Sequence, residues 1–148
     1  MFRSEAPLRA PLTTPAEVVT FWRTAGPDLW FAKNTEFDAE FTARCNLLYT
    51  AAAEGELDAW STTPEGALAL VILLDQFPRN AFRGTPRMFA SDAKAVEVAD
   101  AALAAGHDRA VEPELRTFFY LPYEHAEDLA LQERAVALFE PLGGEVLR

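Results

Sequence analysis

Four polar side chains follow directly on the most apolar segment of the chain. They are Asp75, Gln76, Arg79 and Asn80. A polar group at the edge of a core is costly unless it is paired, and an aspartate at the end of a helix opposes the helix dipole. We therefore expect Asp75 to pair with Arg79 or Arg83 through a bidentate contact. Such a pair is either a brace for a loop over residues 77–90 or part of a site that holds a carboxylate or phosphate.

A second group of polar side chains is centred on His125. Its members are Tyr120, Glu124, His125, Asp128 and Gln132. Helical spacing puts two of them on a stripe that must face the core. The stripe contains His125, Leu129, Gln132, Val136 and Phe139. Buried polar groups need partners, so we expect the His125 ring to lie close to Arg79 or Asn80.

Three interpretations of the His125 group stay open. His125 could be a general base oriented by Asp128 or Glu124, the group could bind a metal, or it could be a satisfied polar core. A di-iron bundle draws Glu-x-x-His motifs from two helices, whereas this chain has a single acid-rich histidine segment. The sequence therefore predicts no metal site and no cofactor. It also contains no glycine-rich phosphate loop and no Gly-x-Ser-x-Gly elbow.

Helix start and stop signals supply the elements that must position these groups. Thr14-Pro15-Ala16-Glu17 is typical of a capping box, and Gly26-Pro27 ends the first helix. Further helices are expected over residues 36–54, 64–76, 92–106, 113–120 and 123–140. Helix-starting prolines recur every 49 residues, at 15, 64 and 113, which suggests stacked hairpins. The prediction is an all-α single domain over residues 14–148, with five to seven helices packed as antiparallel hairpins, after an N-terminal arm of residues 1–13.

The apolar segments indicate where the core lies. Residues 67–74 are apolar without a break, so their helix should be buried on all sides. Trp30-Phe31, next to Lys33, either covers the core or lines a groove, and we favour the core because large aromatic side chains dominate burial. The single cysteine, Cys45, excludes an intramolecular disulfide and is expected to fill the core.

Charge and hydropathy exclude several classes of function. The 148 residues carry 23 acidic and 13 basic side chains, for a net charge of −10. This charge disfavours nucleic-acid backbones and anionic membrane surfaces as partners. The N-terminus lacks the pattern of a signal peptide, and no apolar run is long enough to span a bilayer. A cytoplasmic location is the expectation.

Several short segments together resemble those of one family. They are Trp30-Phe31-x-Lys33, Phe37-Asp38, Gly55-x-Leu57-x-x-Trp60, Leu73-Leu74-Asp75-Gln76-Phe77-Pro78-Arg79-Asn80, Arg83-Gly84-Thr85, Phe89-Ala90-x-Asp92, Phe118-x-Tyr120-Leu121-Pro122, Glu124-His125-x-Glu127-Asp128 and Gln132. Over roughly residues 17–140 they are similar to the domain of unknown function 924 family. The resemblance implies an all-helical, tetratricopeptide-like fold and no established activity.

Members of that family usually continue further, with a second Phe-Pro-His-Arg-Asn-like run. This chain ends at Arg148, so we expect it to lack the family's C-terminal segment. A site that depends on the second run would then be incomplete.

Three functions remain as hypotheses. The first is a binding module whose polar pocket takes a small anionic or polar ligand, a peptide or a protein. Its ligand-binding residues are Asp75, Gln76, Arg79, Asn80, Arg83, Tyr120 and Gln132. The alternative is a hydrolase-like enzyme with His125 as general base, Asp128 or Glu124 as its orienter and Arg79 as an anion clamp. The third is a helical interaction scaffold whose polar cluster is only structural.

Overall fold

Helices form the framework of the protein in the computed structural model, which describes residues 10–142. They are α2 (Pro15–Ala25), α3 (Pro27–Trp30), α4 (Thr35–Ala53), α5 (Pro64–Val71), α6 (Phe77–Ala81), α7 (Asp92–Ala104), α8 (Pro113–His125) and α9 (Leu129–Phe139). Short 3-10 turns are η1 (Asp58–Thr62), η3 (Pro86–Phe89), η4 (His107–Ala110) and η5 (Glu140–Leu142). No strand occurs in this part of the chain, so the all-α prediction is confirmed.

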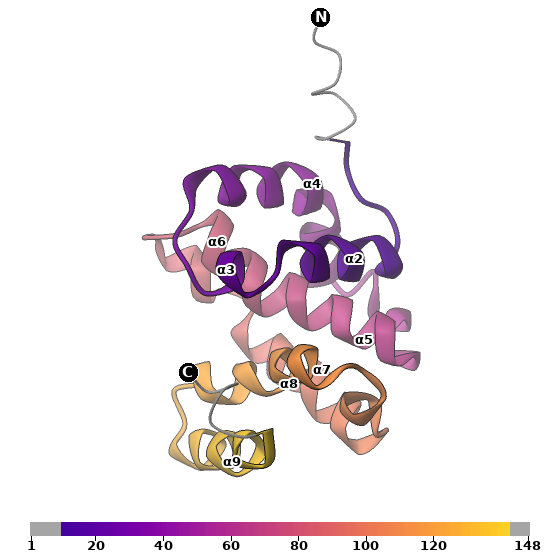
Figure 1. The fold of residues 1–148 in the computed structure, drawn as a ribbon, viewed down its shortest axis with the longest axis vertical. Helices are drawn as coiled ribbons and strands as arrows, with labels where there is room; N and C mark the ends of the chain where they lie inside the picture. Colours follow the sequence, from indigo (N-terminus) through magenta and orange to yellow (C-terminus); the bar gives the residue numbers. More distant parts are fainter. Residues whose placement is uncertain (1–9, 143–148) are drawn as a thin grey trace, which may run out of the picture.

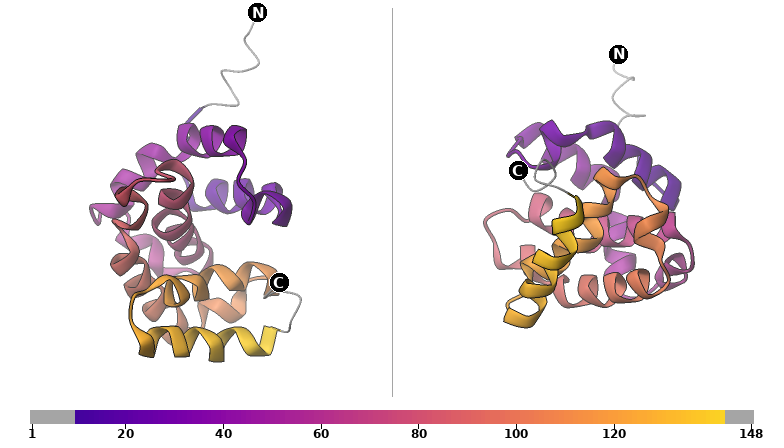
Figure 2. Two further views of the ribbon diagram at one scale, coloured as in Figure 1. Left: turned by 90° about the vertical axis from the view of Figure 1, so that its left-hand side faces the viewer. Right: turned by 60° about the horizontal axis from the view of Figure 1, so that its bottom comes forward.

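One long helical segment runs through the middle of the fold. It consists of α5, the π-turn η2 (Ile72–Gln76) and α6, and we call it the central helix. Figure 1 shows it between α2 and α4 on one side and α7 and α8 on the other. α2 packs on α5 and α4 packs on α6, while α7 and α8 cover the opposite side of α5. α9 lies along α8 at the outer edge (Figure 2).

The predicted helix starts are built from side-chain caps. The Thr14 hydroxyl accepts from the Glu17 amide, and the Glu17 carboxylate accepts from the Thr14 amide, which completes the expected capping box. At the start of α5 the Thr63 hydroxyl accepts a hydrogen bond from the Gly66 amide. Gly66 also lies so close to η1 that a β-carbon there would stand 2.0 Å from the Trp60 carbonyl oxygen.

The central helix is the most buried element, as its composition predicts. Every residue from 66 to 78 is buried, including the polar pair Asp75 and Gln76. Among residues 10–142 the core also includes the fully buried Cys45, in line with its expected role as a filler.

The predicted loop over residues 77–90 begins later than expected, because a π-turn carries the helix through to Ala81. The Phe77 amide donates to the Ile72 carbonyl, five residues back. Pro78 has no amide hydrogen for the Leu74 carbonyl four residues before it. That carbonyl accepts instead from the buried Ser91 hydroxyl, at 2.6 Å. A proline that argues for a loop in sequence is thus accommodated inside a helix.

An aromatic cluster joins the N-terminal helices to α8. Trp22 contacts the rings of Trp30, Phe41 and Phe118, and Trp30 donates its indole hydrogen to the Trp22 carbonyl at 2.7 Å. Trp30 therefore covers the core as predicted. Phe31 does not, because 63% of its surface is exposed.

The last two helices correct the sequence prediction. α8 continues through Pro122 to His125, although Leu121-Pro122 predicts a break. Tyr123 is fully buried beyond the proline and bonds Asp100 on α7, so tertiary packing outweighs the local preference. The last helix consequently begins at Leu129 and not near residue 123.

The predicted core-facing stripe of α9 is also wrong in two of its apolar members. Leu129 and Val136 are 72% and 70% exposed. The inward face instead carries Ala135 and Phe139, with Leu131 partly buried beside them. Only Phe139 of the predicted apolar stripe packs inward.

The predicted arm, residues 1–13, lies outside the described residues up to residue 9, as do residues 143–148 of the predicted domain. The rest of the arm runs along α4. The Leu12 amide donates to the Arg44 carbonyl at 2.8 Å, and Arg44 Nε donates to the Ala10 carbonyl at 2.7 Å. Within residues 10–142 no helix has the length and apolar character that a bilayer crossing requires.

Candidate functional site

The two polar groups singled out in the sequence meet at one hydrogen bond. His125, in the last turn of α8, contacts Oδ1 of Asp75 through Nδ1 at 2.9 Å. Arg79 Nη1 reaches the same oxygen at 3.4 Å. The predicted proximity of His125 to Arg79 is therefore confirmed. The helix boundaries differ from the prediction, because Arg79 lies inside the central helix and His125 ends α8.

Asp75 is the centre of a buried polar network. It is 1% exposed, and it lies in the π-turn η2. Besides His125 and Arg79, the Gln76 amide donates to its Oδ2 at 2.9 Å. A buried carboxylate needs such donors, because an unpaired one would carry the full cost of leaving water.

Arg79 ties this network to α7. Its guanidinium donates to both oxygens of Asp92, at 2.8 and 2.9 Å, and to the Asp75 carbonyl at 3.0 Å. Burial opposes the charge of Arg79, but the hydrogen bonds to Asp92 and the charges of both aspartates outweigh it and raise the pKa of the guanidinium. The predicted Asp75–Arg79 contact exists, yet the bidentate partner is Asp92. Arg79 acts as the brace that the sequence allowed for.

Arg83 binds elsewhere than expected. Its Nε and Nη2 donate to the carboxylate of Asp38 at 2.9 and 3.0 Å, and Asn80 donates to the same carboxylate at 2.9 Å. Asp38 lies in the first turn of α4, where the helix dipole favours a negative charge. The Arg83–Asp38 ion pair joins the segment after α6 to α4. Arg83 therefore does not pair with Asp75, which is contacted by Arg79 and His125.

A cavity of about 490 Å³ opens over these side chains, and we call it the polar pocket. Its lining residues come from the α3–α4 connection, the central helix and the end of α8. They are Trp30, Phe31, Ala32, Lys33, Gln76, Arg79, Asn80, Arg83, Leu121, Glu124 and His125. The side chains of two of them, Lys33 and Glu124, form no hydrogen bond or ion pair with any described residue.

Asp75 lies buried behind His125 and does not line the polar pocket, and three further predicted site residues lie away from it. Tyr120 donates to Asp108 at 2.6 Å, and burial together with this bond raises the pKa of its phenol. Gln132 donates to the Ala126 carbonyl at 2.7 Å. Asp128 is the N-cap of α9 and accepts from the Leu131 amide at 3.0 Å. None of the three lines the cavity.

The residue that orients His125 was also misassigned. Neither Asp128 nor Glu124 contacts the ring, and Asp75 takes that position. A carboxylate accepts hydrogen bonds, so Nδ1 carries the proton in this contact, and in the neutral form of the ring Nε2 keeps its lone pair. Such an imidazole can accept a hydrogen bond or a proton from a molecule in the pocket.

Asp38 and Asp92 are the residues that sequence reasoning missed as members of the network. Each stands in the first turn of a helix, which explains an acidic residue without a site. A usable signal was the excess of cations in the residues that follow Asp75. Asp75 alone could not have neutralised both Arg79 and Arg83.

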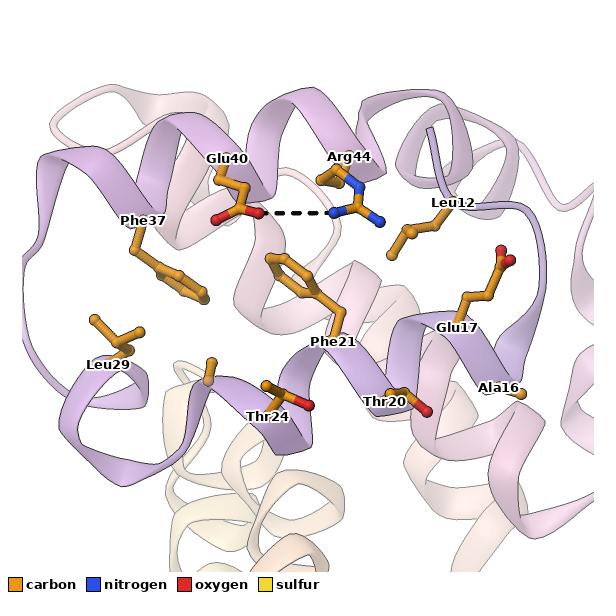
Figure 3. Close-up of a pocket in the computed structure, with 11 residues that line it drawn as sticks. Leu12, Ala16, Glu17, Thr20, Phe21, Thr24, Leu29, Phe37, Glu40 and Arg44 are labelled. Atoms are coloured by element: carbon orange, nitrogen blue, oxygen red, sulfur yellow. Dashed lines mark ion pairs between the residues drawn. The ribbon is translucent and has the colours of Figure 1, made fainter. Parts of the chain in front are cut away.

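A larger cavity, of about 600 Å³, lies between α2 and α4 (Figure 3). Its floor is apolar, with Phe21 and Phe37 pointing into it. Its charged side chains are already engaged: Glu17 caps α2, and Glu40 pairs with Arg44 at 3.6 Å. It offers less chemistry than the polar pocket, although it has more room.

The predicted absence of a metal site stays a prediction. Within residues 10–142, no three His, Cys, Asp or Glu side chains are grouped as metal ligands would be. His125 and Asp75 thus contact each other without a third ligand nearby.

Fold and pocket together define an all-helical protein in which a buried aspartate–histidine pair backs a polar cavity. The chain belongs to the family described as bacterial proteins of unknown function (DUF924), whose family model matches residues 18–147. It is similar to the solved structure of a protein of unknown function, ATU0120 from Agrobacterium tumefaciens. The two are 53% identical, with a TM-score of 0.88 over 90% of this chain and 76% of that chain. No curated protein was found to match.

Proposed function

We propose that the protein is a binding module that holds a small anionic or polar ligand, or the end of a peptide, in the polar pocket. The observation that carries the proposal is the 2.9 Å contact between His125 and Asp75. It leaves Nε2 of the imidazole available in a cavity that also contains Arg79 and the side-chain amides of Gln76 and Asn80. A few convergent polar groups in a pocket are typical of ligand sites.

The hydrogen-bonding capacity left over in the pocket supports a polar ligand. Gln76 and Asn80 each donate inward to a carboxylate, so their carbonyl oxygens are left as acceptors. Arg83 uses Nε and Nη2 on Asp38 and keeps Nη1. Lys33 brings a cation that no described carboxylate neutralises. A ligand with an anionic group could bind Lys33 without breaking the network.

The π-turn is a second, independent support. Such turns interrupt α-helical winding and are frequent at functional sites. Here the turn carries Asp75, which contacts His125, and Gln76, which lines the pocket.

A thermal-shift and NMR screen with small carboxylates, phosphates and polar metabolite-like compounds tests the proposal. We expect at least one class to raise the melting temperature and to shift the amide signals of residues around Lys33 and His125. Lys33→Gln should abolish the effect, while Lys94→Gln, at the chain's other lysine, should leave it unchanged. A ligand that ignores Lys33→Gln and His125→Gln would bind elsewhere and contradict the proposal.

The second candidate function is a hydrolase-like enzyme with His125 as general base. The same Asp75–His125 contact favours it, because a buried carboxylate that orients a histidine recurs in hydrolytic sites. No serine or cysteine lines the pocket, so the base would have to activate water. Turnover of ester or phosphoester substrates that is lost in both His125→Gln and Asp75→Asn would support it.

A pocket that is closed to solvent or binds nothing would leave the scaffold hypothesis, in which the network only braces the helices.

The proposal also includes the cytoplasmic location expected from the sequence. The membrane and nucleic acids are not proposed as partners, given a net charge of −10.

A further inference from the structure

Two opposite charges without partners line the polar pocket. Lys33 belongs to the α3–α4 connection, and Glu124 belongs to the last turn of α8. Neither side chain forms a hydrogen bond or ion pair with the rest of the described chain, whereas Arg79 and Arg83 in the same pocket are held by Asp92 and Asp38. The charges of the pocket that have no protein partner are therefore one cation and one anion, both on exposed side chains.

The pocket also has an apolar wall. Phe31 is 63% exposed, which is unusual for so large an apolar side chain. Its ring stacks on Phe118, with centroids 6.1 Å apart and planes at 14°, and meets the Trp30 ring at 82° with centroids 6.0 Å apart, while most of its surface stays exposed. Leu121, beside Glu124 on α8, extends this wall. An apolar group on the ligand would find an aromatic platform here.

We infer that the ligand is a zwitterion of the α-amino acid type with an aromatic or large apolar side chain, either a free amino acid or a short peptide. The inference rests on the proposed function and names the ligand class for the same pocket. Its carboxylate would bind Lys33, its ammonium group would bind Glu124, and its side chain would lie against Phe31. A cavity of about 490 Å³ has room for such a molecule.

Other ligand classes fit the pocket less well. A polyphosphate needs several free cations, but two of the three permanent cations here are already paired. A simple cation would leave Lys33 without a partner and would be repelled by its positive charge. Only a molecule with both charges satisfies both side chains at once.

Four chemical probes separate these possibilities when titrated into the full chain by calorimetry. They are L-phenylalanine, the dipeptide Phe-Gly, N-acetyl-L-phenylalanine and L-phenylalaninamide. The acetylated probe lacks the ammonium group and the amide lacks the carboxylate, so each should bind about 10-fold more weakly than L-phenylalanine. The ratio of the first two affinities tells a free amino acid from a peptide.

Two variants test which side chain meets which group. Glu124→Gln should weaken L-phenylalanine about 5- to 10-fold and leave N-acetyl-L-phenylalanine unaffected, because that probe has no ammonium group to lose. Lys33→Gln should do the same for L-phenylalanine and spare L-phenylalaninamide. Glu127→Gln and Lys94→Gln are matched controls outside the pocket and should change none of the affinities.

The outcomes show separately whether the ligand is a zwitterion and whether the pocket binds a ligand at all. Equal binding of L-phenylalanine and its acetylated form, or indifference to Glu124→Gln, would overturn the zwitterion and leave a plain anion site. If none of the four probes binds but phosphate or benzoate does, in a manner that depends on Lys33, the zwitterion also fails and the pocket stays a ligand site. If no compound of either kind binds, both proposals fail together.

Discussion

Replacing Asp75 by asparagine tests the buried network most directly, because the change alters charge with almost no change in shape. Asp75 receives hydrogen bonds from Gln76, Arg79 and His125 and is 1% exposed. Arg79 keeps its bidentate contact with Asp92 in the variant, so it is not left unpaired. The bonds from Gln76 and His125 lose their ionic component, and one oxygen becomes a donor.

The size of the effect follows from these contacts. A hydrogen bond to a charged group contributes ~1.5–3 kcal/mol and a neutral one ~0.5–1.5 kcal/mol, so two weakened bonds amount to ~2–3 kcal/mol. His125→Gln removes one donor whose side chain is 23% exposed, and should cost ~1–2 kcal/mol. If the two residues stabilise each other, Asp75→Asn with His125→Gln should cost ~1–2 kcal/mol less than the sum.

Urea denaturation followed by tryptophan fluorescence and far-UV circular dichroism measures these free energies. The three tryptophans report on the folded core, and unchanged m-values would show that the unfolded reference is the same. Glu112→Gln is the control: its partner Arg23 is 2.8 Å away but both side chains are about half exposed, so the cost should stay below ~1 kcal/mol. Additivity within ~0.5 kcal/mol would refute the argument, because it would mean that Asp75 and His125 do not share an interaction in solution.

Three further predictions concern the core. Gly66→Ala should destabilise the protein by ~3 kcal/mol or more, because the new β-carbon would meet the Trp60 carbonyl oxygen at 2.0 Å. Leu70→Asp, at a buried position of the central helix, should prevent cooperative folding, since it would bury an unpaired charge. Burial raises the pKa of the Cys45 thiol from 9.0 to about 12, so the unfolded chain releases a proton in this range that the folded chain retains. Stability from this group is complete below pH 9 and decreases by ~1.4 kcal/mol per pH unit between pH 9 and 12.

Each of these has a direct check. The gain in helix propensity from glycine to alanine is only ~1 kcal/mol and cannot offset the expected loss, so wild-type stability in Gly66→Ala would contradict the close approach. A soluble Leu70→Asp variant with a sharp unfolding transition would show that the helix face is not enclosed. For Cys45, the comparison is with Cys45→Ala between pH 8 and 10, where only the wild type should show the thiol's contribution. If the stability of the wild type and of Cys45→Ala changed with pH in the same way, the thiol would make no such contribution.

Much of the fold follows from local signals in the sequence. Thr14 and Thr63 are side-chain caps followed by proline, and the helices start where they predict. The uninterrupted apolar run before Asp75 correctly identifies the most buried helix. These features could be predicted because caps and apolar periodicity act over a few residues and leave a direct trace in sequence.

The errors arose where distant contacts override local preference. Pro78 and Pro122 each lie inside a helix, because a hydroxyl from Ser91 satisfies one freed carbonyl and the burial of Tyr123 holds the other segment in place. Because α9 begins at Leu129 and not near residue 123, a different set of its residues faces the core. No local pattern carries that information.

The candidate site shows the same division. The sequence grouped Asp75, Arg79 and His125 correctly because buried polar groups must find partners. It could not choose among partners separated by tens of residues, so Asp38 and Asp92 were missed. It named Asp128 or Glu124 as the residue that orients His125 because they are near in sequence, which does not measure distance in space.

The π-turn has a consequence for how the chain can vary. Over Ile72–Gln76 the helix holds one residue more than α-helical winding would use, and each residue turns an α-helix by about 100°. Deleting a single codon there would relax the backbone but swing Arg79 and Asn80 a quarter-turn or more away from Asp92 and Asp38. The core-filling and pocket-forming halves of the central helix are thus kept in phase by one supernumerary residue. Point substitutions can adjust either half alone, whereas a change of length at this point alters both together.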